Sequence, residues 1–209
     1  FMPKQLTASA ENFLLEEGVV EDVEVPRAEG KNVKIDWRPY RDSMYVRSSE
    51  DQAFDIFTSN EHELDGTLIL TPDGLRANGE FYWSEARMNS KLFSFKRNSI
   101  FSDTAGVVIN SIESEDAALE TGNMLFEVDF DTNYGKFYSN NDDNYTKLTR
   151  NKFSTNLDQF DWEIDEQKVI FKPEEDEQGR FLSINEKQDS LNFLGDMASL
   201  SLENSLLEI

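Results

Sequence analysis

LFEVDFDTNYGKFYS, residues 125–139, is the stretch of this 209-residue sequence that decides the fold. Apolar and polar side chains alternate on both sides of a central Thr-Asn-Tyr-Gly at 132–135. Alternation with a period of two is typical of a strand with one buried face. A short break that contains Asn and Gly predicts a hairpin or a tight bend between two such strands.

The same pattern occurs twice more, at residues 160–171 and 198–209. Asp131, Asp165 and Glu203 hold the equivalent turn position and lie 34 and 38 residues apart. A loose repeat of this length indicates stacked β units. The sequence therefore predicts an all-β fold, a solenoid-like or open β-jelly roll of short strands, with a two-sheet β-sandwich as the runner-up.

Short alternating runs separated by turn residues continue along the rest of the chain. Strands are predicted over residues 19–25, 33–37, 43–47, 54–57, 67–70, 75–77, 81–83, 91–95 and 106–112. Turns are predicted at Asp65-Gly66, Pro72-Asp73-Gly74 and Asn78-Gly79.

Residues 113–121 form the best helix candidate, of about two turns. No domain boundary is visible, so we expect residues 1–209 to form a single β-rich domain, with 1–18 as a flexible or extended lead-in. Both ends look cut, and we expect a fragment of a longer repeat-containing protein whose targeting signal lies outside it.

The composition excludes several classes of function. Sixteen Phe and 12% aromatic residues argue against disorder, although only 38% of residues are hydrophobic. A net charge of -22 argues against partners rich in phosphate, so no nucleic acid and no anionic membrane surface is expected as a partner. The absence of cysteine excludes disulfides and thiolate chemistry. No apolar run reaches the ~20 residues of a membrane-spanning helix.

The sequence contains little that could carry catalysis. His62, the one histidine, lies between Glu61 and Glu63, and we expect it to be a bystander on the surface. No Gly-x-Ser-x-Gly, Walker or Gly-x-Gly-x-x-Gly motif is present. One histidine without cysteine also disfavours zinc. We predict a protein that is not an enzyme, with no catalytic residue, no cofactor and no metal ligand.

Three groups of residues are candidates for ligand sites. Asp161 and Asp165 flank Trp162 and could line a sugar site, but we expect Trp162 to be a core residue with both acids in solvent. Residues 140–144, NNDDN, offer oxygen ligands for calcium, but the EF-hand spacing is missing and a plain loop is favoured. Aromatic residues that could stack on sugar rings, but are more often core, are Trp37, Tyr40, Tyr82 and Trp83.

Several phrases carry a resemblance to a known family. They are LILTPDGL at 68–75, SKLFSF at 90–95, SDTA at 102–105, VDF at 128–130, GKFYSN at 135–140, FLSI at 181–184 and QDSLNF at 188–193. Together these phrases resemble large envelope proteins of Bacteroidetes bacteria, which in turn are similar in style to the OstA/LptA family. The resemblance implies a β-jelly-roll or solenoid segment that works in the periplasm or at the outer membrane. LptA-like proteins hold lipid acyl chains in an apolar groove, but no motif allows a binding residue to be assigned in this sequence.

The function that we expect is a non-catalytic structural or binding segment of a bacterial cell-envelope protein, which acts as a β scaffold. Its partners would be flanking repeats or other envelope proteins, with lipid or glycan as further partners. One alternative is a lipid- or lipopolysaccharide-handling segment of OstA/LptA type, which requires a hollow interior. Another is a carbohydrate-binding β-sandwich module, which requires Trp37, Tyr82 or Trp83 to be exposed on one face.

Overall fold

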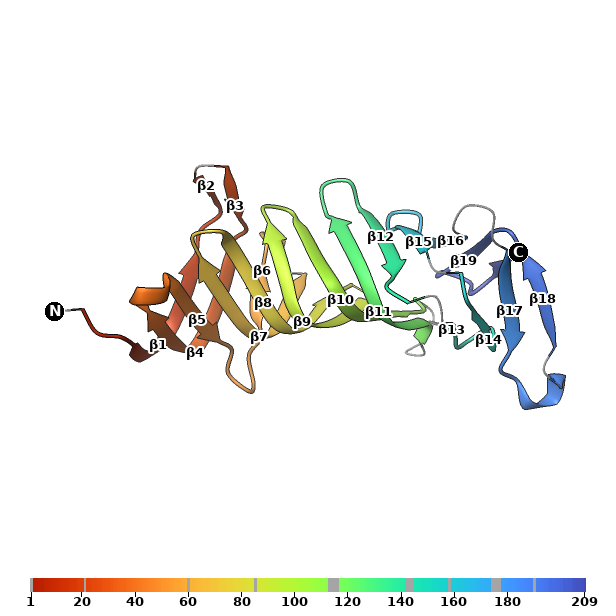
Figure 1. Cartoon of the computed structure of the whole chain (residues 1–209), viewed down its shortest axis with the longest axis horizontal. Helices are drawn as coiled ribbons and strands as arrows, with labels where there is room; N and C mark the ends of the chain where they lie inside the picture. The colour runs from red at the N-terminus through yellow and green to blue at the C-terminus, as the bar shows by residue number, and fades with distance from the viewer. Residues whose placement is uncertain are drawn as a thin grey trace. The chain divides into compact units, whose positions relative to one another are not determined.

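The computed structural model of the chain describes residues 2–20, 22–59, 61–84, 86–112, 117–141, 145–157, 159–173, 178–189 and 191–209. Within these residues the chain is all-β, as the sequence predicts (Figure 1). Its helical segments there are two 3₁₀ turns of three residues, Pro39–Arg41 and Glu186–Gln188. Neither the length nor the hydropathy of a described helix is sufficient to cross a bilayer.

The strands form two compact units. Unit 1 contains Phe1–Ser84 and Asn89–Phe101, and unit 2 contains Glu85–Met88 and Ser102–Ile209. The strands β9 (Ala86–Lys96) and β10 (Ser99–Asn110) therefore contribute residues to both units.

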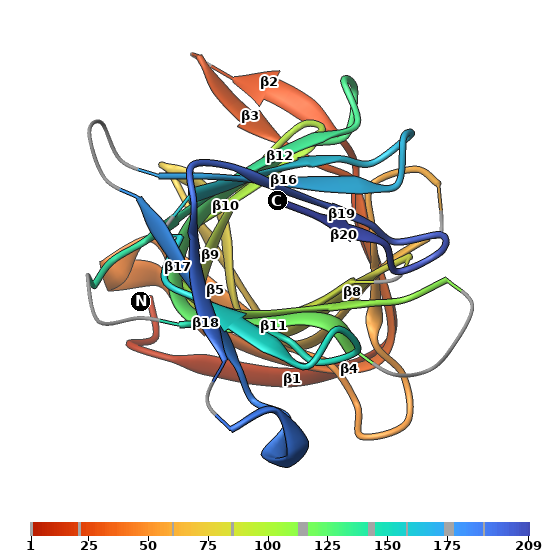
Figure 2. The same ribbon diagram turned by 90° about the vertical axis from the view of Figure 1, so that its right-hand side faces the viewer.

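In unit 1, one long strand can pair along the same edge with two shorter strands, one at its beginning and one at its end. The first residues of β4 pair with β6, and its last five residues pair with β5. The strand β7 then pairs with β6 through its beginning and with β5 through its end, and β8 pairs with the whole of β7. The other edge of β4 carries β1 (Figures 1 and 2). The strands and the small β2–β3 hairpin have the bounds β1 (Leu6–Leu15), β2 (Gly18–Val20), β3 (Val23–Val25), β4 (Ala28–Arg38), β5 (Ser43–Arg47), β6 (Phe54–Ile56), β7 (His62–Thr71) and β8 (Gly74–Trp83).

Unit 2 uses the same arrangement. The end of β11 begins one ladder, in the order β12, β15, β16, β19 and β20, and several of these strands lie side by side in Figure 2. The beginning of β11 starts a second ladder, in the order β13, β14, β17 and β18. The bounds are β11 (Ala117–Asp129), β12 (Tyr134–Ser139), β13 (Thr146–Leu148), β14 (Phe153–Thr155), β15 (Gln159–Glu163), β16 (Lys168–Lys172), β17 (Gly179–Ser183), β18 (Asn192–Gly195), β19 (Ala198–Ser201) and β20 (Leu207–Glu208).

The long strands change partners at Asn residues. Asn32 has a φ of 52° and separates the part of β4 that pairs with β6 from the part that pairs with β5. Asn123 has a φ of 54° and occupies the corresponding position in β11. Asn tolerates a positive φ better than other residues with a Cβ atom, so each long strand can bend there without ending. The strands of these ladders pair antiparallel in both units, which differs from the parallel coils of a solenoid.

The predicted repeat is confirmed in unit 2. Its three copies form the hairpins β11–β12, β15–β16 and β19–β20, which are successive pairs in one ladder. Asp131, Asp165 and Glu203 all lie in the hairpin turns. Adjacent turns are joined by backbone hydrogen bonds, from Ile164 N to Asn133 O at 3.1 Å and from Leu202 N to Gln167 O at 2.8 Å.

The core of unit 2 consists of side-chain rows that run across the strands. Phe126, Phe137, Phe160 and Phe171 are successive cross-strand partners and are at most 1% exposed. Their neighbouring ring centroids lie 5.6, 4.4 and 5.6 Å apart. These are contact distances for aromatic rings, so the phenylalanines fill the space between the strands.

Two predicted turns lie inside strands instead. Asp65-Gly66 belongs to β7 and Asn78-Gly79 to β8, and Gly66 pairs with Gly79. A Cβ atom on Gly66 would lie 2.0 Å from the carbonyl oxygen of Asn78, and one on Gly79 would lie 2.1 Å from that of Asp65. The two glycines therefore allow two backbones to approach closely. In a sequence, a glycine needed for such a contact cannot be distinguished from a glycine needed for a turn.

Two further predictions need correction. Residues 117–121 of the predicted helix lie in β11, and residues 113–116 are outside the described residues. Residues 19–25 are not one strand, because β2 and β3 form a hairpin with Asp22 at a φ of 71°. In contrast, the turn at Pro72-Asp73 is confirmed, and the predicted strand 43–47 coincides with β5.

Candidate functional site

His62 is not on the surface, contrary to the sequence prediction. It lies in β7 and is only 5% exposed. Its ring stacks on Trp83 at 5.6 Å and on Phe81 at 6.0 Å, and Phe57 contacts it edge-on at 5.1 Å. Side chains alternate between the two faces of β7, so His62 points inward while the neighbouring Glu63 is exposed. The acidic neighbours of His62 in the sequence led to the wrong prediction of a surface position.

Burial also sets the charge of His62. Desolvation lowers the pKa of the imidazole from 6.5 to about 4, so the ring is neutral at pH 7. Its Nδ1 atom lies 2.9 Å from the Ser59 hydroxyl. With 5% of its surface exposed and aromatic rings packed on it, His62 is a member of the core.

The carboxylates around Trp162 do not form a paired site. Trp162 is 2% exposed and belongs to the core, as expected. Asp161 lies on the opposite face of β15 and forms an ion pair with Lys172, so it is not in free solvent. Asp165 is exposed in the hairpin turn, where it accepts a hydrogen bond from Asn133 Nδ2 at 2.9 Å.

The possible calcium loop can be followed only in part. Asn140 Nδ2 donates a hydrogen bond to the backbone carbonyl of Asp103 at 2.7 Å. This contact holds the start of the loop against a neighbouring strand. Residues 142–144, which hold both aspartates of the segment, are outside the described residues. Among the residues that the structure describes, no group of three or more His, Asp or Glu side chains is arranged to hold a metal ion.

The aromatic residues considered for sugar stacking differ in their exposure. Trp83 is 5% exposed and lies in the core cluster with His62. Tyr82 is the neighbouring residue in β8 and therefore lies on the opposite face of the strand. Trp37 and Tyr40 are 41% and 67% exposed. Of the three residues on which a sugar-binding face was expected to depend, Trp83 is buried and Trp37 is exposed.

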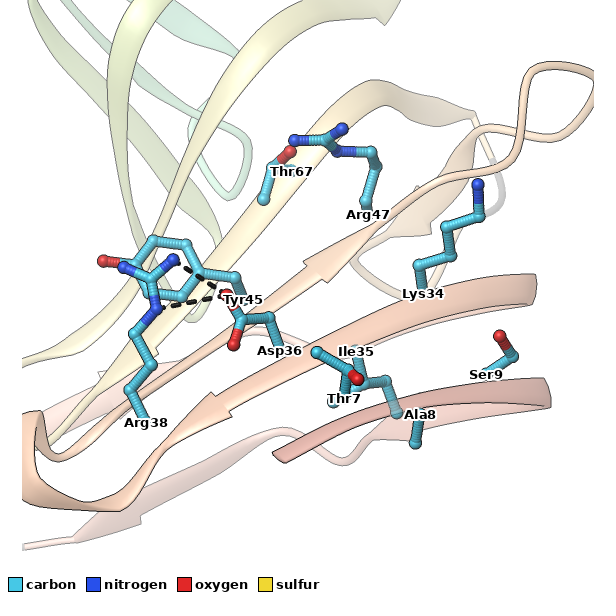
Figure 3. Close-up of a pocket in the computed structure, with 10 residues that line it drawn as sticks. All are labelled: Thr7, Ala8, Ser9, Lys34, Ile35, Asp36, Arg38, Tyr45, Arg47 and Thr67. Carbon is cyan, nitrogen blue, oxygen red and sulfur yellow. Dashed lines mark hydrogen bonds and ion pairs between the residues drawn. The ribbon is translucent and has the colours of Figure 1, made fainter. Parts of the chain in front are cut away.

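A depression of about 550 Å³ on unit 1 is the best candidate for a binding site (Figure 3). It lies over β1, β4, β5 and β7, on the face of these strands opposite to the buried Val46 and Leu68. The antiparallel registers place its polar side chains in two rows that cross the strands. One row is Ser9, Lys34, Arg47 and Thr67, and the other is Thr7, Asp36 and Tyr45.

One end of the depression is held by an ion pair. Asp36 accepts hydrogen bonds from Arg38 Nε at 3.1 Å and Nη2 at 2.8 Å, and from Gln5 Nε2 at 2.8 Å. These bonds, of which those from Arg38 have the largest effect, lower the pKa of Asp36, while Asp36 raises the pKa of Arg38. The Arg38 guanidinium also lies over the Tyr45 ring, 4.4 Å from its centroid. Arg38 is therefore paired with Asp36 and packed on Tyr45.

Lys34 and Arg47 are in a different situation. They are direct cross-strand partners on β4 and β5 and rise from the same face (Figure 3). In the part of the chain that the structure describes, neither side chain forms an ion pair or a hydrogen bond. Two like charges directly opposite each other on a sheet destabilise it, so an anion between them would remove this repulsion.

A second depression, of about 420 Å³, adjoins the first at Arg38. It is lined by Lys4, Gln5, Arg38, Tyr40 and Arg41. Tyr40 Oη donates to Met2 O at 3.1 Å, which places this depression beside the start of β1. Both depressions are therefore rich in cationic side chains.

Sequence reasoning does not find this site. A usable signal exists in β4, where Lys34, Asp36 and Arg38 alternate on one face. The other half of the site comes from β1, β5 and β7, whose register with β4 cannot be read from the sequence. Comparisons of the chain with protein-family models, with curated proteins and with solved structures gave no match.

Proposed function

We propose that the chain is a non-catalytic β scaffold of a bacterial cell envelope, built to be extended by further β-hairpins. The observation that carries the proposal is the stacking of three repeat hairpins in one ladder of unit 2. Each hairpin adds a turn, a strand pair and one more section of the buried side-chain rows. Repetition of one unit with nearest-neighbour contacts is the way in which repeat proteins build extended surfaces. The envelope location is supported by the resemblance of the sequence phrases.

Both ladders of unit 2 end on strands that can accept a further strand. The strand β18 pairs with β17, and β20 pairs with β19. A Cβ atom on Gly195 would lie 2.4 Å from Ile209 Cγ2, so the ends of the two ladders meet. Large apolar side chains that are 45–58% exposed gather on these strands and the segments beside them: Ile184, Leu191, Leu194, Met197, Leu206 and Ile209.

An open edge with exposed apolar side chains is a template for another strand. The occupant that fits is a hairpin of the same kind, from a second copy of the chain or from a neighbouring envelope protein. Within residues 200–209 the side chains available for such a contact are Leu206 and Ile209, because Leu200 and Leu202 are buried.

Sedimentation velocity over a wide range of protein concentration tests the proposal. The wild-type chain should associate as its concentration rises. The exposed-edge variants Leu194→Lys and Leu206→Lys should remain monomeric, because a charged side chain opposes pairing at an edge. Tyr145→Lys is the matched control, since Tyr145 is 47% exposed in unit 2 but lies before β13. A wild type that stays monomeric, or a control that dissociates equally, would contradict the proposal.

A lipid-handling role is the second candidate, and one observation favours it. The inward face of unit 1 has an apolar row of cross-strand partners, Leu6, Trp37, Met44 and Leu70. Leu6 and Trp37 remain 44% and 41% exposed there. An apolar row that is incompletely covered could contact an acyl chain, and co-purified lipid is the observation that would separate this role from a filled scaffold.

A further inference from the structure

The outward face of β4, β5 and β8 has a strip of positive charge in a protein whose net charge is -22. Lys34 and Arg47 are cross-strand partners, and Arg76 lies in the next row, where it pairs with Ile69. Arg38, at the end of the strip, is paired with Asp36. With 42 acidic residues in the chain, cations could readily have been placed beside carboxylates, yet Lys34 and Arg47 face each other.

The cross-strand neighbours of these cations carry hydroxyl groups, and the Asp36 carboxylate in the next row is held by Arg38. Ser9 is the cross-strand partner of Lys34 on β1, and Thr67 is the partner of Arg47 on β7. Hydroxyl, cation, cation and hydroxyl therefore follow one another across four strands, at the ~4.8 Å spacing of strands in a sheet. Thr7 adds a third hydroxyl in the next row.

This order of groups restricts the ligand. The two cations can share one anionic group, since their strands are adjacent, and the hydroxyls on both sides can exchange hydrogen bonds with ligand hydroxyls. A volume of about 550 Å³ lies in the range of small-molecule sites, ~300–1,000 Å³. The ring of Tyr45 is covered by Arg38, so aromatic stacking is not the main contact.

We infer that this face of unit 1 binds an acidic saccharide, with its carboxylate or phosphate between Lys34 and Arg47 and its ring hydroxyls against Ser9 and Thr67. An acidic peptide would fit less well, because a peptide gains its specificity from pockets for side chains. Here the row that holds Lys34 and Arg47 continues on both sides with hydroxyls, those of Ser9 and Thr67. The site lies within unit 1, and the strand edges of the scaffold lie in unit 2. The outcome of a binding experiment is therefore independent of the outcome of the association experiment.

Isothermal titration of the full chain tests the inference with five probes: digalacturonate, glucose 6-phosphate, a neutral disaccharide, inorganic phosphate and an Asp/Glu peptide. The first two distinguish a carboxylated from a phosphorylated ligand. At least one of them should bind roughly 10-fold or more tightly than the other three probes, since hydrogen bonds to charged groups contribute most of the affinity. The affinity should fall as salt is added.

Charge-neutral variants assign the binding to the strip. Lys34→Gln and Arg47→Gln should each weaken binding roughly 10-fold or more. Lys31→Gln is the matched control, because Lys31 is exposed on the same strand but does not line the depression, and it should bind as the wild type does. The melting temperatures of Lys34→Gln and Arg47→Gln should be unchanged or higher, because each removes a repulsion. A merely structural role would lower them.

Each of the following results would overturn the inference. The acidic saccharides fail to bind, or inorganic phosphate, the neutral sugar or the acidic peptide binds as tightly as they do. Equal loss of binding in Lys31→Gln would place the ligand elsewhere. A fall in melting temperature together with binding in the Lys34 and Arg47 variants would show that these residues support the fold instead.

Discussion

At the scale of single residues, the burial of His62 makes the stability of the fold depend on pH. The pKa of His62 in the folded chain is about 4, and the pKa of an ordinary histidine is 6.5. Between these values the unfolded chain binds a proton that the folded chain excludes, so stability is lost as the pH falls from 6.5 to 4. A variant that lacks the imidazole is needed to isolate the contribution of His62 to this loss.

We therefore predict different acid sensitivities for the wild type and His62→Phe. The variant keeps a ring beside Trp83 but has no titrating group, so its melting temperature should fall less between pH 6.5 and 4. Thermal unfolding followed by circular dichroism measures this difference. His62 is the one histidine of the chain, so its proton resonances also report its pKa directly. Equal slopes for the two proteins, or an NMR midpoint near 6.5, would refute the buried assignment.

The facing glycines of β7 and β8 lead to a second prediction. Gly66→Ala should destabilise the fold by about 2 kcal/mol or more, because the new methyl group would overlap the Asn78 carbonyl. Gly79→Ala should cost at least as much, since Gly79 also has a φ of 136°. Gly18→Ala is the control, because a methyl group added to Gly18 would have no atom within 4 Å. Urea denaturation gives the three values, and a loss in Gly18→Ala as large as that in Gly66→Ala would be inconsistent with the close approach.

Some residue-scale features can be predicted from the sequence and others cannot. The core position of Trp162 is predicted correctly, since it lies in an alternating run with Phe160. The surface position expected for His62 is wrong, because its charged neighbours conceal the alternation that points it inward. The turns expected at Gly66 and Gly79 are also wrong, since glycine permits both a turn and a close backbone contact.

At the scale of the strands, the phenylalanine row of unit 2 should account for a large part of its stability. Phe137 lies between Phe126 and Phe160 and is fully buried. We predict that Phe137→Ala destabilises the fold by about 3–5 kcal/mol, through lost burial and the cavity that remains. Tyr138→Ala, one residue further on the opposite face and 38% exposed, should cost about 1 kcal/mol or less. Comparable losses in chemical denaturation would contradict a core on one face of β12.

The pairing of strands shows where sequence reasoning stops. The hairpins at 125–139, 160–171 and 198–209 can be predicted because each has its own alternation and turn. The two-ladder arrangement cannot, since it depends on a bend at Asn32 and at Asn123 in strands that otherwise continue. The candidate site escapes prediction for the same reason. Its two rows of side chains exist only in the register of β1, β4, β5 and β7.

At the scale of the whole molecule, the all-β character follows directly from the sequence. The buried histidine is neutral at pH 7, and Asp161 is paired with Lys172. The features with chemical specificity are surfaces: the cationic strip of unit 1 and the apolar strand edges of unit 2. The two proposals made above rest on these two surfaces.

Native mass spectrometry of the chain purified from a bacterial host, with lipid extraction of the same sample, tests the central claim most directly. A scaffold with a filled core should give the bare chain mass of 24.1 kDa and its small multiples, with no acyl lipid in the extract. Stoichiometric acyl-chain mass on the folded protein would contradict this account. It would mean that the apolar row at Leu6 and Trp37 opens into a hollow interior, and that the chain handles lipid.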